Sequence, residues 1–289
     1  MFGPADGILG LAYIGLDDAY LMRGKTWPLK YDVGQITKLG QQKDLPPFFN
    51  ELTTALNVAQ VFGFYSLRSI KRGSANPAQD PINQGWLIRG GGPESTGLYT
   101  GAFQNAAVVG DDWYDTNLKS VQVGNQAPIP VAPFLEKHNG LTISNSIIDT
   151  GTNSIQIVQS VYDKMLASFQ AINSEFITPI KNGALGSGNG VPNSVLDLPW
   201  PNITFVLQGQ TSDVTLTVTP QTYWQADAIQ AGTALFVIFA TQPPQSILGL
   251  PVLNNYFTVF DQTPTPGIVR FASIVQPSNG QLPTPGAPA

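Results

Sequence analysis

Short stretches of β-forming residues, separated by turns, constrain the fold of this chain more than any other feature. The 289 residues include 29 glycines and 24 prolines, which is the turn chemistry that many short strands need. Several stretches alternate polar with apolar residues or are rich in β-branched and aromatic ones. Examples are Val61–Leu67, Gly85–Arg89, Leu118–Val123, Ile203–Leu207, Val214–Val218, Ala234–Phe239 and Tyr256–Phe260. The pattern predicts an all-β fold with barrel- or sandwich-like lobes.

Two stretches have a helical period instead, which adds two minor helices to the prediction. Apolar residues between Val158 and Ile172 fall on one stripe, so we expect a helix over Gln159–Ala171. Pro47–Leu56 is a shorter candidate with proline in its first turn. Arg72–Asn83 and Asn182–Asn193 have the composition of linkers.

Charge and residue content exclude several classes of protein. Fourteen Lys and Arg against 19 Asp and Glu give a net charge of −5, which repels the phosphates of nucleic acid. There is no cysteine and only one histidine, His138, so a thiol nucleophile and a multi-histidine metal site are excluded. We expect no metal, no cofactor and no membrane span, since no uncharged apolar run reaches 18 residues. Asp111-Asp112 and Asp115 sit in turn-like contexts and are expected to decorate loops.

An acidic turn after an apolar stretch is the strongest chemical signal. Asp149-Thr150-Gly151-Thr152 follows Ile147-Ile148. Gly151 permits a tight turn beside the carboxylate, and the two threonine hydroxyls can hydrogen-bond to the backbone or to Asp149. Three residues recur by chance, however, and a turn in which aspartate caps a helix has the same sequence.

Two similar glycine-containing segments add specificity to this signal. Ile247-Leu248-Gly249-Leu250 lies downstream, with 98 positions between Gly151 and Gly249. Ile8-Leu9-Gly10-Leu11, within Asp6–Tyr13, repeats the same four residues near the start of the chain.

With these motifs the chain resembles the pepsin-like aspartic proteases, which have two similar β lobes. In that family each lobe gives one Asp-Thr/Ser-Gly loop and one apolar-apolar-Gly segment that packs beside it. The resemblance implies that Asp149 is catalytic, that Thr150, Gly151 and Thr152 support it, and that Ile247-Leu248-Gly249 is the partner of this second-lobe loop. Asp6–Tyr13 looks like the partner segment of the first lobe. Further similar stretches are Gly90–Gly92, Tyr99–Gly101, Leu198–Pro199, Ile203–Phe205 and Tyr256–Asp261.

The same resemblance suggests residues that contact a peptide substrate. Asn153 follows the loop, Ile147, Ile157 and Ile247 would offer an apolar wall, and Trp113 would line one side of a cleft or pack in the core. The chain also departs from the family: Ile155–Val158 replaces a Leu-Thr-Gly-Pro-like stretch, and the common second-lobe disulfide is absent. Asp261 resembles a structural aspartate at a strand end.

One Asp-Thr-Gly accompanies two Ile-Leu-Gly segments, which affects the domain prediction. If the lobes are pseudo-repeats, the first catalytic loop falls about 98 residues before Gly10, outside this sequence. We therefore expect residues 1–90 to be a remnant of the first lobe with its connection, and residues 91–275 to be the complete C-terminal catalytic lobe. Residues 276–289 are proline-rich and expected to be a disordered tail.

The implied function is aspartic endopeptidase activity on protein or peptide substrates, by a water activated between two carboxylates that share a proton. Only Asp149 of that pair is in this chain, so the isolated chain is expected to be inactive. Two alternatives stay open: a non-catalytic protease-like protein that binds peptides or inhibits enzymes, and a homodimer that pairs two Asp149 loops. The family is mostly secreted, vacuolar or lysosomal. The absence of cysteine and of a visible signal peptide is also compatible with a bacterial or intracellular origin.

Overall fold

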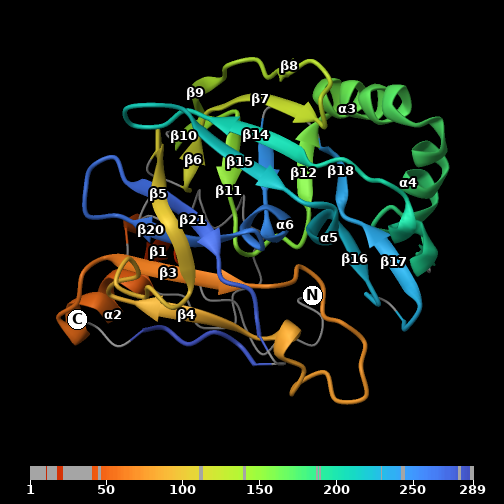
Figure 1. The fold of residues 1–289 in the computed structure, drawn as a ribbon. Helices are drawn as coiled ribbons and strands as arrows, with labels where there is room; N and C mark the ends of the chain where they lie inside the picture. The colour runs from red at the N-terminus through yellow and green to blue at the C-terminus, as the bar shows by residue number, and fades with distance from the viewer. Residues whose placement is uncertain are drawn as a thin grey trace.

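The computed structural model describes residues 11, 18–21, 41–44, 47–110, 113–138, 141–186, 188, 190–228, 230–241, 245–278 and 281–286. Within these ranges the chain forms 21 strands and five helices (Figure 1). The predicted all-β class is confirmed. No helix in the described ranges is both long and apolar enough to cross a membrane.

A five-stranded antiparallel sheet pairs strands from residues 61–107 with strands from residues 256–274. Its strands, in spatial order, are β4 (Gly85–Arg89), β3 (Val61–Ser66), β20 (Tyr256–Asp261), β21 (Ile268–Ile274) and β5 (Tyr99–Ala107). Every residue of β20 is buried, and Phe260 stacks on Phe62 of the neighbouring strand at 4.6 Å between ring centroids. The sheet therefore holds strands from both sides of the expected boundary at residue 90.

The remaining large sheets form a second layer that carries the Asp149 loop (Figure 1). One has the order β18 (Ile238–Thr241), β12 (Ile155–Val158), β19 (Ser246–Leu248), β11 (Ser146–Ile148), β6 (Asp115–Thr116). Another has the order β15 (Val214–Val218), β14 (Ile203–Leu207), β7 (Leu118–Val123), β8 (Ile129–Pro130).

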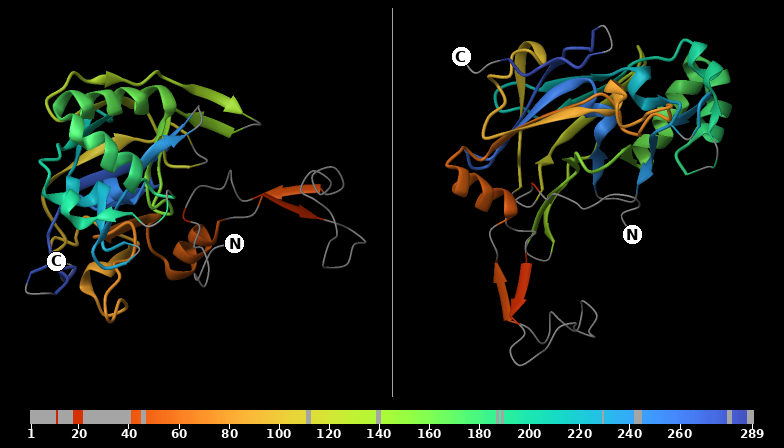
Figure 2. Two further views of the ribbon diagram at one scale, coloured as in Figure 1. Left: turned by 90° about the vertical axis from the view of Figure 1, so that its right-hand side faces the viewer. Right: turned by 90° about the horizontal axis from the view of Figure 1, so that it is seen from below.

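Three smaller sheets complete the strand inventory. One has three strands, β13 (Val191–Pro192), β17 (Thr233–Phe236) and β16 (Trp224–Ala226). Two are antiparallel pairs: β9 (Leu135–His138) with β10 (Leu141–Ser144), and β1 (Asp18–Leu21) with β2 (Gln41–Asp44). The β1–β2 pair projects from the body of the molecule in both views of Figure 2.

The two predicted helices are present, and three shorter ones accompany them. α3 (Gln159–Ile172) buries Val161, Met165 and Phe169, which lie on the predicted stripe, and α2 (Phe48–Leu56) matches the shorter candidate. The additional helices are α4 (Ile177–Gly183), α5 (Pro220–Tyr223) and α6 (Leu250–Leu253). With four to seven residues each, they are too short for an apolar period to reveal them.

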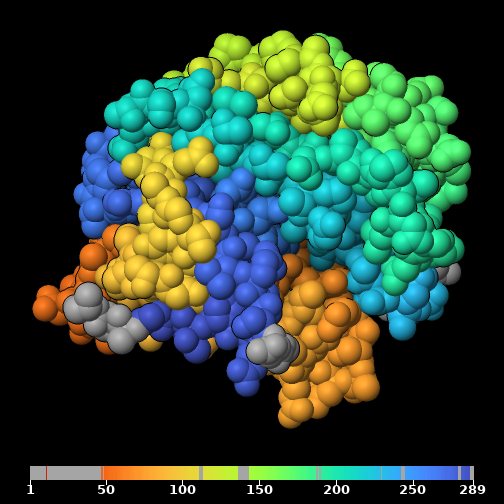
Figure 3. Space-filling view, viewed as in Figure 1, coloured from red at the N-terminus to blue at the C-terminus, as the bar shows by residue number. Residues whose placement is uncertain are grey.

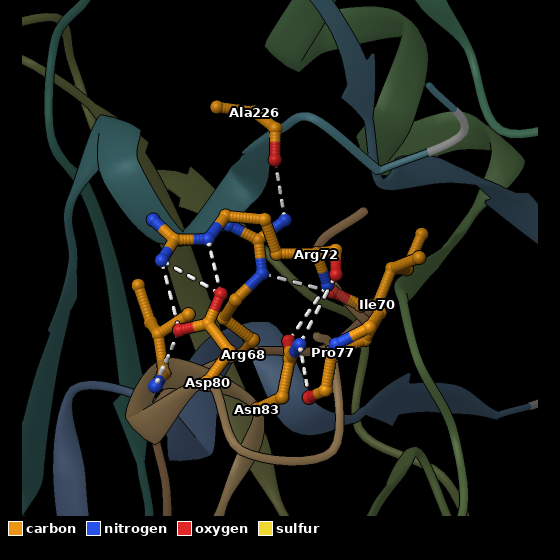
Figure 4. Close-up of polar contacts among 8 residues, drawn as sticks. Arg68, Ile70, Arg72, Pro77, Asp80, Asn83 and Ala226 are labelled. Carbon is orange, nitrogen blue, oxygen red and sulfur yellow. Dashed lines mark hydrogen bonds and ion pairs between the residues drawn. The ribbon is translucent and has the colours of Figure 1, made fainter. Parts of the chain in front are cut away.

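The loop between β3 and β4, expected to resemble a linker, is instead held by charged and polar side chains (Figure 4). Arg72 donates from Nε and Nη2 to the two carboxylate oxygens of Asp80, both at 2.8 Å. Arg68 donates to the carbonyl oxygens of Ile70 and Ala226, which ties the loop to β16. In Figure 3 the loop (orange) borders C-terminal residues (blue). A cavity of about 570 Å³ lies between this loop and the α5 and α6 region.

The C-terminal tail does not stand free where the structure describes it. Trp86 on β4 donates from Nε1 to the carbonyl oxygen of Pro283 at 2.9 Å. Leu282 packs against a cluster that includes Tyr65, Leu98 and Phe257. Residues 281–286 therefore lie against the central sheet, which composition alone does not predict.

The end of β20 offers a test of what stabilises the central sheet. Asp261 accepts hydrogen bonds from the backbone and hydroxyl of Thr263 and from Arg270. Burial acts to raise the pKa of Asp261, but these bonds outweigh it and the pKa lies below its ordinary value. The ionised Asp261 carboxylate therefore contributes its full stabilisation of the fold at pH values above the pKa that Asp261 has in the unfolded chain. This stabilisation is lost as the pH falls through the lower pKa that Asp261 has in the folded protein.

We expect Asp261→Asn to lower the free energy of unfolding by about 1–3 kcal/mol at neutral pH, because the buried carboxylate loses its charge-assisted bonds. Urea denaturation across pH should show the gap to the wild type narrowing below about pH 4. Asp213→Asn is the control, since the Asp213–Lys119 ion pair is exposed and contributes under about 1 kcal/mol. An equal loss for Asp261→Asn at all pH values would contradict the assignment.

Candidate functional site

Two parallel strands place the acidic loop beside the second glycine segment. β11 pairs with β19 so that Ile147 lies opposite Ile247 and Ile148 opposite Leu248. At the end of this pair the backbone N–H of Asp149 donates to the carbonyl oxygen of Leu248 at 3.2 Å. The structure thus brings together two segments that are far apart in the sequence.

The carboxylate of Asp149 is oriented by its own loop. Its Oδ1 accepts a hydrogen bond from the backbone N–H of Gly151 at 2.8 Å, and its Oδ2 accepts from the hydroxyl of Thr152. Asp149 is half-buried, as is Thr150, while Gly151 and Asn153 are exposed. Both carboxylate oxygens are therefore held in a fixed direction by a turn that leaves the group within reach of solvent.

Gly249 allows the two segments to approach so closely. A Cβ at this position would lie 2.3 Å from the carbonyl oxygens of both Thr152 and Ser154. The backbone N–H of Leu250 donates to the carbonyl oxygen of Thr152 at 2.8 Å. The glycine in the Ile-Leu-Gly pattern is therefore a requirement of backbone packing at the Asp149 loop.

The predicted substrate-contacting residues occupy different environments. Ile147 and Ile247 are half-buried at the same register of the β11–β19 pair, and Trp113 is also half-buried. Ile157 is fully buried in the hydrophobic core. It is therefore removed from any wall that a substrate touches, because the inward face of β12 points into the core rather than toward solvent.

Asp115 is expected on an exposed loop, but its environment in the structure is different. It lies in β6, is 0% exposed and accepts four hydrogen bonds, so its expected place as loop decoration is wrong. Burial raises its pKa. The short sequence Trp113-Tyr114-Asp115-Thr116 gave no signal for this, because a two-residue strand has no detectable alternation. Asp111 and Asp112 lie outside the described residues.

The predicted first-lobe partner segment, Asp6–Tyr13, lies outside the described residues except for Leu11. The carbonyl oxygen of Leu11 accepts hydrogen bonds from the hydroxyl of Tyr114 at 2.9 Å and from Nε2 of Gln262 at 3.2 Å. Leu11 is therefore fixed between Tyr114, which directly precedes β6, and Gln262, which directly follows β20.

The chemistry that this arrangement offers is that of one oriented carboxylate. Asp149 can accept a proton or, when protonated, donate one. Among the described residues no group of three or more His, Cys, Asp or Glu side chains is placed to hold a metal ion. The cavity beside the β3–β4 loop is lined by none of the predicted site residues. The candidate site is the Asp149 loop, because its carboxylate is oriented by hydrogen bonds and remains partly exposed.

Comparison with known protein families supports this reading of the geometry. The family model described as eukaryotic aspartyl protease matches residues 42–273, which is most of the chain. The matched range includes β11, the Asp149 loop and β19. A comparison with curated proteins finds no match.

The close packing around Gly249 predicts that adding a single methyl group there strongly destabilises the fold. Gly249→Ala should lower the free energy of unfolding by about 1–3 kcal/mol or more, since the new Cβ meets backbone oxygens that cannot rotate away. Gly73→Ala is the matched control: Gly73 is exposed and its Cβ would meet only an ordinary contact at 3.6 Å. Thermal unfolding of both variants checks this, and a melting temperature of Gly249→Ala equal to that of the control would refute the packing argument.

Proposed function

Because the chain belongs to the eukaryotic aspartyl protease family, we propose that Asp149 is one of two carboxylates that together hydrolyse peptide bonds. The observation that carries the proposal is the Asp149 carboxylate itself. The backbone N–H of Gly151 and the hydroxyl of Thr152 hold it, at the point where β11 and β19 end side by side.

Peptide hydrolysis by this route needs a pair of carboxylates that share one proton. The ionised member takes a proton from the attacking water, and the protonated member donates to the carbonyl oxygen of the scissile bond. Asp149 alone can do one of these at a time. The sequence contains a single Asp-Thr-Gly and no Asp-Ser-Gly. We propose that the second carboxylate comes from polypeptide outside these 289 residues and that the isolated chain is inactive.

Four partly or fully exposed residues support the proposal that an extended peptide substrate binds near Asp149. Ile147 and Ile247 lie opposite each other in the β11–β19 pair and are partly exposed. Asn153 is exposed beside the loop. Trp113 is half-buried and lies two residues before β6 begins. In this proposal residues 91–275 form the catalytic lobe. Residues 1–90 are a remnant of the first lobe with its connection, of which β3 and β4 pair into the shared sheet, and residues 276–289 form the tail.

An activity assay tests the proposal directly. The 289-residue chain should show negligible cleavage of an unfolded protein at about pH 3–5. A chain joined at Met1 to a lobe that carries a second Asp-Thr-Gly or Asp-Ser-Gly should show activity that pepstatin-type inhibitors block. In the joined protein Asp149→Asn should abolish turnover, with the melting temperature nearly unchanged because the substitution is almost isosteric.

Asp163→Asn is the matched control, because Asp163 is exposed on α3 and should leave turnover unchanged. Activity of the joined protein that survives Asp149→Asn would remove Asp149 from the mechanism. Cleavage by the 289-residue chain that rises with the square of its concentration would favour a homodimer. An inactive joined protein that still binds peptides would favour a non-catalytic protein.

A further inference from the structure

Buried polar side chains lie beneath the strands that carry the Asp149 loop. In a hydrophobic interior such groups are costly unless they are hydrogen-bonded, so their concentration here calls for a role. They come from β6, from the end of β10 and the start of β11 with the residue between them, and from the start of β19. Each is at most 2% exposed: Asp115, Thr116, Ser144, Asn145, Ser146 and Ser246.

Asp115 is the only ionisable member of this layer, and it joins three segments. Its Oδ1 accepts from the backbone N–H and the hydroxyl of Ser144 and from Nε2 of Gln245, each at 3.0 Å. Its Oδ2 accepts from the backbone N–H of Trp113 at 3.3 Å. A carboxylate is acceptor-only and can take four such donors at once, which no neutral side chain of this size can do.

Ser144 and Gln245, which donate hydrogen bonds to Asp115, lie just before the two strands that lead to the site. Ser144 comes two residues before β11, and Gln245 immediately precedes β19. Asp115 itself lies opposite Ile147 in the β6–β11 pair. One carboxylate therefore holds the entrances of both parallel strands, whose far ends carry Asp149 and Gly249.

No salt bridge to Asp115 is found among the described residues, and all four of its hydrogen-bond donors are uncharged groups. Burial raises the pKa of Asp115, while the four hydrogen bonds lower it. The side chains that donate to the carboxyl group, Ser144 at the end of β10 and Gln245 just before β19, are uncharged. The adjoining strand β11 (Ser146–Ile148) has no charged residue and is followed directly by Asp149. Asp111 and Asp112, which precede β6, lie outside the described residues.

We propose that Asp115 is a positioning residue for Asp149: by holding the entrances of β11 and β19 together, it fixes the Asp149 loop against Gly249. The proposal rests on the proposed function only in naming Asp149 as the group that is positioned. Asp115 acts through the two strands and touches no substrate.

Amide hydrogen exchange of the 289-residue chain tests this without requiring activity. Asp115→Ala removes all four bonds, and exchange should become about tenfold faster or more in peptides covering 144–152 and 245–254. Peptides from α3 should change much less. Asp115→Asn can keep the three bonds to Oδ1 and lose the one from Trp113, so it should restore exchange to within about threefold of the wild type.

Two further variants make the result decisive. Thr116→Val removes a buried hydroxyl of the same strand, bonded to Ser146, and should leave the exchange of 245–254 unchanged. Gln245→Met removes only the hydrogen bond from Gln245 Nε2 to Asp115. It should speed amide exchange in residues 245–254 but not in residues 144–152. It also serves if Asp115→Ala fails to fold.

Uniform acceleration across all peptides, or none in either strand, would overturn the positioning role. In the joined protein, kcat should fall for Asp115→Ala with little change in KM and should be largely rescued by Asp115→Asn. A joined protein without any activity would refute the proposed function and leave the exchange result standing, so the two failures are distinguishable.

Discussion

The parallel pairing of β11 with β19 is the interaction on which the rest of the candidate site depends. It aligns Ile148 with Leu248 and brings the backbone of Asp149 to the carbonyl oxygen of Leu248. The pairing has no local support, because the two strands are about 100 residues apart and have three residues each. Its stability comes from neighbouring strands, from the close approach at Gly249 and from the buried polar layer below.

That layer shows why a polar interior is useful at this place. A purely apolar core would bury the strands equally well, but it would allow them to slide, since apolar contacts have no direction. Hydrogen bonds from Ser144 and Gln245 to Asp115 have a fixed geometry and a fixed register. The region thus combines an apolar exterior at Ile147 and Ile247 with a directional interior.

Much of the fold follows from the sequence, and the exceptions have physical causes. β4, β7, β14 and β15 have the bounds that their side-chain pattern predicts. Ala234–Phe239 is split at Val237, where the backbone bonds to Tyr223 and Ile155 instead of continuing one strand. The proximity of the Asp149 loop and Gly249 followed from a resemblance. The burial of Ile157 and Asp115 did not, because local pattern says little about which face of a very short strand meets the core.

The topology also dictates an order of assembly. The central sheet is incomplete until β20 and β21 pair with β3 and β5, and β11 has its parallel neighbour only once residues 246–248 exist. Contacts of such long sequence separation form late in folding and slowly. During synthesis from the N-terminus, β11 therefore emerges about 100 residues before its parallel partner β19, and the Asp149 loop cannot be held in place until β19 follows. Translation itself thus delays the assembly of the acidic site in the nascent chain.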